Sequence, residues 1–274
     1  MLDTNPFVSP RSNTRNLVAV ELALAMVFNS LGIELDPRDT SEAQVRVLAD
    51  LGFGSLSVGV QDFAPNVQAT INRLQSAKQT AELIASARVA GFTSIGVDLV
   101  YGLPGQSTDS LARTVDEVAA MAPDRVALFG YAHLPHLRPH QRLVERQPIP
   151  DVSHRADLLC TAIAGLTRKG YQRAGFDHFA RPGDPLAIAA RNGSLHRNFQ
   201  GFTNARGGPL IACGVTGISE GSASGFADLA AIVRFNNQGY IDARSGSSYA
   251  ASTVPYSAHT WKYRSGTGIV SPPP

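Results

Sequence analysis

The chain has 274 residues, of which 43% are hydrophobic and 17% are charged, and its formal net charge is +2. This composition is typical of a folded protein with a sizeable core and excludes an intrinsically disordered chain. Because no block of basic residues is present, we expect no nucleic-acid-binding surface. Cys160 and Cys213 are too far apart in sequence for a metal knuckle, so we expect no metal site and a reducing, cytoplasmic setting.

The most apolar run of the sequence is residues 17–28, "LVAVELALAMVF". With 12 residues and Glu21 inside it, this run is too short to span a bilayer. It predicts a core helix at about 13–30 and a protein without a membrane segment. A signal peptide is the alternative, since Arg11 and Arg15 precede the run, but no small-x-small cleavage site follows it at the right place.

The next part of the chain alternates helical-period segments with short β-rich segments. We predict helices at 41–51, 65–74, 78–90 and 108–121, and strands at Gly32–Leu35, Ser55–Val60, Ser94–Leu99 and Arg125–Tyr131. Four βα-type units in a row indicate an α/β fold with a parallel sheet, either barrel-like or doubly wound.

The second half of the sequence has weaker signals. Residues 135–153 are rich in Pro, His and Arg and are typical of a long connection, and a helix is predicted at His154–Arg168. Residues 170–185 predict a strand and a loop, followed by a short helix that ends at Asn192. Residues 244–274 are rich in Ser, Gly, Tyr and Pro, and we expect a mostly disordered tail there.

Polar residues stand at or near the carboxyl end of each predicted strand. They are Glu34, Gln61, Asp62, Asp98, Tyr131 and His133. Ligands of parallel α/β folds bind at this edge, where the βα loops converge. The alternative is that polarity simply resumes where each strand reaches the surface. Four consecutive strands that end in this way favour a ligand site.

Three other groups of residues are weaker candidates for a functional site. A metal site at His133, His136 and His140 is disfavoured, because the segment is broken by prolines and has no Cys or acidic ligand nearby. Asp177 and His178 are a plausible acid–imidazole pair, but adjacent residues on a strand point to opposite faces, which disfavours a catalytic triad. A solvated face or an anion site would each explain the closely spaced arginines Arg173, Arg181, Arg191 and Arg197.

Seven blocks of the sequence, in order, resemble the oxygen-independent coproporphyrinogen III oxidases. These radical S-adenosylmethionine enzymes are the coproporphyrinogen dehydrogenases of haem biosynthesis. The related haem chaperones share part of the pattern, but "DHFARP" and "HRNFQGF" favour the oxidases. The blocks are "IELDPR" (33–38), "SVGVQDF" (57–63), "INRLQ" (71–75), "GVDLVYGLPGQ" (96–106), "PDRVALFGYAHLP" (123–135), "FDHFARPGD" (176–184) and "LHRNFQGFT" (195–203).

The resemblance implies an incomplete parallel βα barrel of six strands, with a four-iron four-sulfur cluster and two S-adenosylmethionine molecules. It implies oxidative decarboxylation of coproporphyrinogen III to protoporphyrinogen by a monomer, for which the arginines at 173–197 suit an anionic substrate. By position in the motifs, the residues expected at the cluster-bound S-adenosylmethionine are Glu34 and Ile218. Those expected at the second molecule are Gln61, Arg73, Asp98 and Ala132.

The sequence departs from the family pattern at both ends. The motif Cys-x-x-x-Cys-x-x-Cys, whose thiolates hold the cluster, is absent. We therefore expect a barrel without its first two strands over residues 1–134, a cofactor-closing segment over 135–221 and a divergent tail over 222–274. The chain is then either an incomplete, inactive oxidase or a cluster-free pseudoenzyme that binds S-adenosylmethionine or porphyrin. A haem chaperone-like protein is the third alternative, so enzymatic activity stays open.

Overall fold

The computed structural model of the protein describes residues 31–198, 201–204, 210, 218–219, 240–242, 263–265 and 268–270. The chain divides into two compact units, residues 1–188 and residues 189–274, which are described separately. The helix predicted at 13–30 lies outside the described residues. The domain boundaries predicted after residues 134 and 221 stay predictions.

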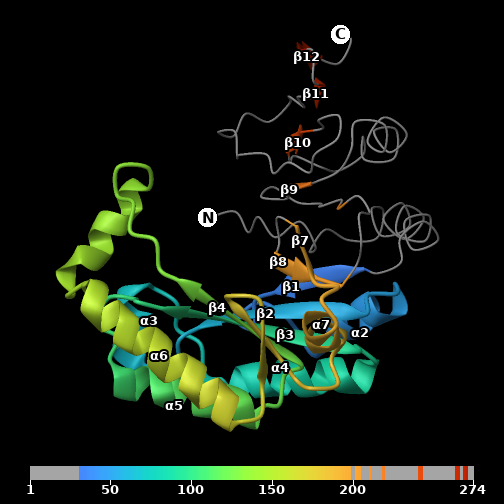
Figure 1. Cartoon of the computed structure of the whole chain (residues 1–274), viewed down its shortest axis with the longest axis horizontal. Coiled ribbons are helices and arrows are strands. Elements are labelled where there is room, and N and C mark those ends of the chain that lie inside the picture. Colours follow the sequence, from blue (N-terminus) through green and yellow to red (C-terminus); the bar gives the residue numbers. More distant parts are fainter. Residues whose placement is uncertain are drawn as a thin grey trace. The chain divides into compact units, whose positions relative to one another are not determined.

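The first unit is built on one six-stranded sheet (Figure 1). Its first four strands are mutually parallel, as the sequence predicts, and the last two form an antiparallel hairpin. The predicted strand and loop at 170–185 is thus a pair of short strands. In spatial order the strands are β1 (Gly32–Leu35), β2 (Ser55–Gln61), β3 (Ser94–Tyr101), β4 (Arg125–Gly130), β6 (His178–Ala180) and β5 (Gln172–Ala174).

Most helices of this unit begin where the sequence places a side-chain cap. Ser41, Ser76 and Ser107 each form a capping box with the residue three positions later. The helix predicted at 65–74 ends at Thr70, because Asn72 adopts a left-handed φ of 53°. The helices are α2 (Glu42–Asp50), α3 (Pro65–Thr70), α4 (Ala77–Ala90), α5 (Thr108–Ala120), α6 (Val152–Arg168), α7 (Pro185–Arg191) and the 3₁₀-helix η1 (Pro139–Arg146).

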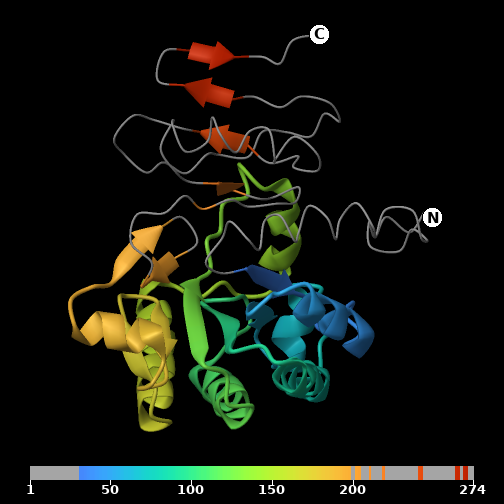
Figure 2. The same cartoon turned by 90° about the vertical axis from the view of Figure 1, so that its right-hand side faces the viewer.

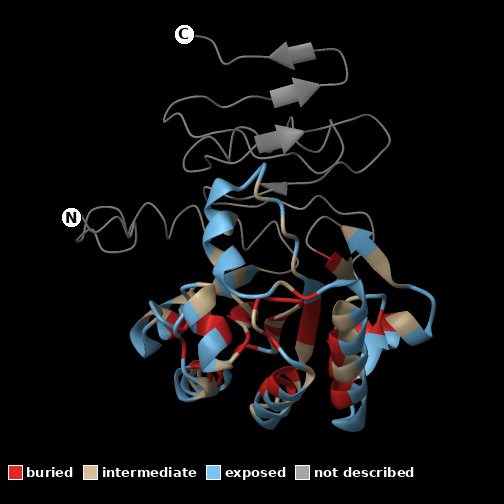
Figure 3. Cartoon of the chain, turned by 90° about the vertical axis from the view of Figure 1, so that its left-hand side faces the viewer, coloured by how far each residue is buried: buried red, intermediate tan, exposed pale blue. Residues whose placement is uncertain are grey.

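The long helices α4, α5 and α6 lie on the same face of the sheet (Figure 2). Between them and the sheet is the core, to which the strands contribute Val58, Val97, Leu128 and Phe179 (Figure 3). A doubly wound sheet carries helices on both faces, whereas a βα barrel carries its helices on the outside only. The arrangement therefore decides between the two alternatives left by the sequence in favour of a partial barrel.

The second unit is described in short pieces. Strands β7 (His196–Asn198) and β8 (Gly201–Thr203) form an antiparallel pair. A four-stranded sheet has the order β12 (Gly268–Val270), β11 (Tyr263–Ser265), β10 (Tyr240–Asp242) and β9 (Ile218–Ser219). The rest of the predicted tail lies outside the described residues, so its disorder stays a prediction. Among the helices that the structure describes, none has the length and apolarity needed to cross a membrane.

Candidate functional site

On β1 to β3, the sheet face opposite the core helices carries small and polar residues. Side chains alternate along a strand, so residues that flank the core valines and leucines point to this face. Strand pairing aligns Glu34 with Ser57, and Gly59 with Asp98. Ser57 Oγ donates a hydrogen bond to Asp98 Oδ1 at 3.1 Å. Carboxylates, a hydroxyl and glycines thus share the surface that forms the interior of a βα barrel.

Asp98 is the most unusual group on this face. Burial raises its pKa to about 6, the hydrogen bond from Ser57 opposes that rise, and the charge of Glu34 adds to it. Within the described part of the chain, Ser57 provides the one hydrogen bond that this carboxylate accepts. Among the described residues no cation pairs with this partly buried carboxylate, and a second acid lies beside it, which is unfavourable for folding. Such a carboxylate suits a site that receives a cationic ligand.

Gly59 allows two further side chains to approach the same place. Arg73 Nη2 donates to the carbonyl oxygen of Gly59 at 2.7 Å. A Cβ atom at position 59 would lie 3.0 Å from Gln61 Nε2 and 3.2 Å from Arg73 Nη2. Gln61 itself has a φ of 69°, and the pairing of β2 with β3 shifts by one residue just before it. The bulge therefore re-aims Gln61, and the glycine leaves it room.

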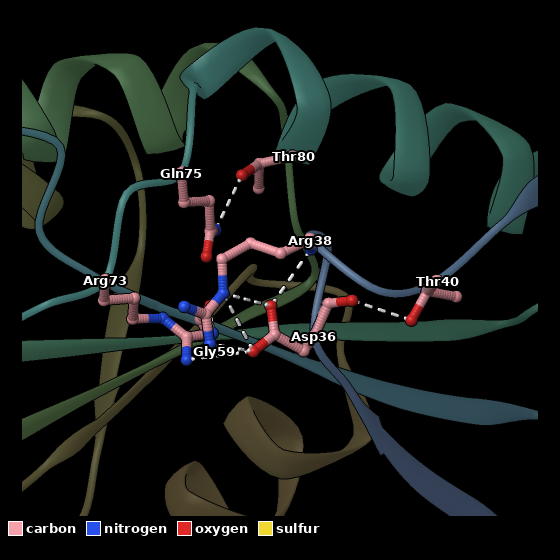
Figure 4. A network of polar contacts seen from close by, with 7 residues as sticks. All are labelled: Asp36, Arg38, Thr40, Gly59, Arg73, Gln75 and Thr80. Carbon is pink, nitrogen blue, oxygen red and sulfur yellow. Dashed lines mark hydrogen bonds and ion pairs between the residues drawn. The ribbon is translucent and has the colours of Figure 1, made fainter. Parts of the chain in front are cut away.

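Asp36 holds the guanidinium of Arg73 from the other side (Figure 4). Arg73 Nη1 lies 3.1 Å from Asp36 Oδ2, and Arg38 forms a two-pronged pair with the same carboxylate. The hydrogen bonds from Arg38 lower the pKa of Asp36 to about 2, aided by the charge of Arg73 and opposed by burial. Arg73 Nε is buried and has no hydrogen-bond partner among the described residues. Sequence reasoning missed Asp36, although "IELDPR" contains it.

Two predicted site residues stand apart from this group. Ala132 is exposed in the loop after β4, where its carbonyl oxygen accepts a hydrogen bond from Gln141 Nε2 at 2.9 Å. Ile218 is in β9 and belongs to the second unit. The structure therefore brings Glu34, Gln61, Arg73 and Asp98 to one end of the parallel strands. The roles of all six residues stay predictions.

Asp62 is not at the surface, although its place at a strand end suggests a surface position. It is fully buried and accepts hydrogen bonds from the Ala64 amide at 2.6 Å, Thr114 Oγ1 at 3.0 Å and Gln106 Nε2 at 2.5 Å. Burial raises its pKa, and these hydrogen bonds oppose the rise. Gln106 Oε1 in turn accepts the Gly102 amide at 2.7 Å. Asp62 thus anchors the "GLPGQ" loop from inside.

The histidine candidates have partners that the sequence did not reveal. His133 Nε2 lies 3.0 Å from Glu145 Oε1, so an acidic residue is near it after all. The described residues contain no group of three possible metal ligands. His178 Nδ1 lies 2.7 Å from Asp177 Oδ1. The expectation that Asp177 and His178 point apart was wrong, because Asp177 precedes β6 and strand alternation does not apply to it.

The four closely spaced arginines do not form one described group. Arg173 Nη2 donates to the Phe176 carbonyl oxygen at 2.9 Å, and Arg181 Nε donates to that of Pro123 at 3.2 Å. These two belong to the first unit, whereas Arg191 and Arg197 belong to the second. Arg173 and Arg181 therefore stabilise loops of their own chain through hydrogen bonds to backbone carbonyl oxygens.

A one-sided partial βα barrel with polar residues at its strand ends is the class of domain that the structure shows, and comparison with known proteins relates it to the radical S-adenosylmethionine enzymes. The model of the Radical SAM superfamily matches residues 9–118. The chain is 46% identical over 189 residues to the oxygen-independent coproporphyrinogen III oxidase of Escherichia coli, and 43% identical over 189 residues to that of Pseudomonas aeruginosa. Each match covers 69% of this chain and 41% of the relative.

The solved structure of Escherichia coli coproporphyrinogen III oxidase (HemN), described as a Radical SAM enzyme, is similar with a TM-score of 0.69 and 42% identity. This match covers 76% of the present chain and 49% of the other. The chain is therefore a relative of the oxygen-independent coproporphyrinogen III oxidases, as its motifs predict. It spans less than half the length of these relatives.

The residues present fit the two cofactors of the superfamily unequally. Arg73 Nε, which has no partner in the described part of the chain, and the carboxylate of Asp98 offer polar contacts that S-adenosylmethionine has groups to satisfy. A four-iron cluster needs three thiolates. The 274 residues hold two cysteines; Cys160 is exposed on α6, and Cys213 lies outside the described residues. These residues do not fit the cluster.

Anaerobic reconstitution of the chain with iron and sulfide tests this mismatch. We expect no charge-transfer absorbance of a stoichiometric four-iron cluster, because two distant cysteines cannot supply its ligands. The measurement is the visible spectrum together with the iron and sulfide content after desalting, with a double variant, Cys160→Ala plus Cys213→Ala, as control. A spectrum that wild type develops at one cluster per chain, and the double variant does not, would contradict the expectation.

Proposed function

We propose that this chain provides an S-adenosylmethionine-binding part of a coproporphyrinogen III oxidase-type domain. The observation that carries the proposal is the convergence of Gln61, Arg73 and Asp98 around Gly59, on the polar face of a parallel βα sheet. The relatives are named for coproporphyrinogen III, and we propose this tetracarboxylate as the substrate of the complete system. Its oxidative decarboxylation gives protoporphyrinogen.

The chemistry of each side chain assigns it a task in this site. The carboxylates of Glu34 and Asp98 accept hydrogen bonds and attract positive charge, and S-adenosylmethionine carries a sulfonium and an ammonium group. Arg73 and Gln61 donate, and the same ligand has a carboxylate and an adenine ring that accept. We assign Glu34 to one molecule of the cofactor, and Gln61, Arg73, Asp98 and Ala132 to a second; a role for Ile218, which belongs to the other unit, stays a prediction. When bound, S-adenosylmethionine supplies the radical chemistry of the superfamily.

Asp36 supports the site by holding Arg73 in place. Its salt bridge fixes one end of the guanidinium while the carbonyl of Gly59 receives the other. An arginine fixed at two points is pre-organised, so less side-chain entropy is lost when a ligand binds to it. Asp36 is therefore a positioning residue.

A second function follows from the cysteine content. A chain that keeps the binding residues and cannot ligate a cluster would bind S-adenosylmethionine or a porphyrin without turning it over. We propose this cluster-free binding role as the alternative for the chain by itself. In both cases binding of S-adenosylmethionine is the shared property, and the two functions differ in whether a cluster is supplied from elsewhere.

The Gly59→Ala variant tests the site with little effect on the fold. Its Cβ would force Gln61 Nε2 and Arg73 Nη2 away, since both would lie within 3.2 Å. We expect the Kd for S-adenosylmethionine, measured by equilibrium dialysis of the full chain, to rise about tenfold, which corresponds to the loss of about one charge-assisted hydrogen bond.

Gly54→Ala is the matched control, because its Cβ would meet Thr93 Oγ1 at an ordinary 3.7 Å. Its Kd should remain that of wild type. If both alanine variants bind like wild type, Gln61 and Arg73 do not contact the cofactor.

A further inference from the structure

Arg155 reaches from α6 to the carboxyl ends of β3 and β4. Its Nη1 donates to the carbonyl oxygen of Tyr131 at 2.7 Å, and its Cζ lies 5.9 Å from the centroid of the Tyr101 ring. Two glycines lie close to this guanidinium. A Cβ at Gly102 would lie 3.3 Å from Arg155 Cζ, and a Cβ at Gly130 would lie 3.3 Å from Arg155 Nη2. Both strand ends thus leave room for this guanidinium.

Arg155 lacks the acidic partner that comparable arginines of the first unit have. Arg73 pairs with Asp36, Arg88 with Asp124, and Arg125 with Asp184. Among the described residues, Arg155 makes no ion pair with a carboxylate, and the one hydrogen bond of its guanidinium goes to a neutral backbone oxygen. Taking a guanidinium partly out of water without an anion is unfavourable. A carboxylate from a ligand would remove this cost.

The geometry of the guanidinium also favours a carboxylate. Arginine presents its N–H groups as a planar fork that matches the two oxygens of a carboxylate. Nη1 donates to the carbonyl oxygen of Tyr131, which leaves Nη2 and Nε to form such a pair with a carboxylate. Gly130 is exposed, and Nη2 is the atom next to it, so the free side of the fork lies at an accessible strand end.

We propose that Arg155 binds a carboxylate of the tetrapyrrole substrate, a propionate side chain, at the carboxyl ends of β3 and β4. This assignment rests on the proposed function. Asp98 lies three residues before Tyr101 on β3, so the two side chains point to opposite faces of the sheet, and the anion position and the cofactor residues share the carboxyl end of this strand. Arg155 carries positive charge and Asp98 can carry negative charge, so this edge separates a position for an anionic substrate from one for a cationic cofactor.

Binding of coproporphyrin III to the full chain, followed by fluorescence, tests the assignment. We expect Arg155→Met to raise the Kd for this tetracarboxylate about tenfold, and Arg155→Lys to raise it less, because lysine keeps the charge and loses the fork. Arg113→Met removes the same charge from an exposed position on α5. This control should bind coproporphyrin III like wild type.

S-adenosylmethionine affinity and thermal melting, measured on the same variants, separate the possible outcomes. Unchanged cofactor affinity and melting temperature in Arg155→Met, with weaker coproporphyrin binding, support the assignment. A lower melting temperature with unchanged coproporphyrin affinity would show that Arg155 only holds the Tyr131 loop, and the assignment would fail. Wild type that binds S-adenosylmethionine and not coproporphyrin III would also overturn it, while leaving the cofactor site intact.

Discussion

The Asp98→Asn variant is expected to be more stable than wild type at about pH 7.5 and to bind S-adenosylmethionine at least about tenfold more weakly. The gain in stability follows from the pKa of Asp98, which lies at about 6 in the folded protein against an ordinary value of 3.8. A shift of about two units corresponds to roughly 3 kcal/mol, and we expect about 1 to 3 kcal/mol. Asparagine still accepts the hydrogen bond from Ser57.

The pH dependence of this gain has a definite sign. A carboxyl group whose pKa is raised by folding binds its proton more tightly in the folded state, so the unfolded chain loses that proton first as the pH rises. The destabilisation by Asp98 is therefore absent below about pH 4, grows through the interval up to its pKa of about 6, and is complete above it. The stability difference between variant and wild type should follow this course.

Urea unfolding at several pH values measures the difference, and equilibrium dialysis gives the affinity. Asp157→Asn removes an exposed carboxylate from α6 and should change neither quantity by more than a few tenths of a kcal/mol. If Asp98→Asn instead destabilises the fold and leaves the affinity unchanged, then Asp98 is a structural residue, and the strand-end pattern reflects only the return of polarity at the surface.

The largest loss of stability is expected for Asp62→Ala. This change removes the acceptor of three hydrogen bonds, from the Ala64 amide, Thr114 Oγ1 and Gln106 Nε2, in a fully buried place. Each orphaned donor costs about 1 to 3 kcal/mol. Because such costs are not additive for neighbouring groups, we expect a total loss of about 3 to 5 kcal/mol in the free energy of unfolding.

Asp62→Asn sharpens the test, because its shape is nearly unchanged. The amide of asparagine has one oxygen that accepts hydrogen bonds, and its nitrogen only donates. Gln106 cannot compensate by turning its side-chain oxygen toward residue 62, because that oxygen accepts the Gly102 amide. Urea unfolding should show a loss of more than about 1 kcal/mol for Asp62→Asn and about 1 to 2 kcal/mol for Thr114→Val, which removes one donor to Asp62 and the acceptor of the Phe63 amide. Wild-type stability of Asp62→Asn would contradict a role for Asp62 as the anchor of the "GLPGQ" loop.

The parallel strands could be predicted from sequence because their signal is local. Strands β1 to β4 alternate with helices, of which α2, α4 and α5 begin at serine caps, and each predicted range overlaps the observed one. The position of Asp98 on the polar face also follows from its place between Val97 and Leu99, which point to the core. Sequence could not decide between a barrel and a doubly wound sheet, because one-sided helix packing depends on contacts between distant segments.

The details of the site depended on partners far away in the sequence. Asp62 and Asp98 are both acids near strand ends, yet one is fully buried and the other faces the polar side of the sheet. The difference comes from Gln106 and Thr114, which lie 44 and 52 residues beyond Asp62. The backbone shift that re-aims Gln61 likewise has no signal in the sequence.

Calorimetric titration of the full chain with S-adenosylmethionine, in wild type and in Asp98→Asn, tests most directly whether the polar face is a cofactor site. We predict saturable binding by wild type, and a Kd at least about tenfold higher for the variant at about pH 7.5, where Asp98 is ionised. No binding by a folded wild-type chain, or equal affinity of the two proteins, would contradict the assignment of this face to S-adenosylmethionine.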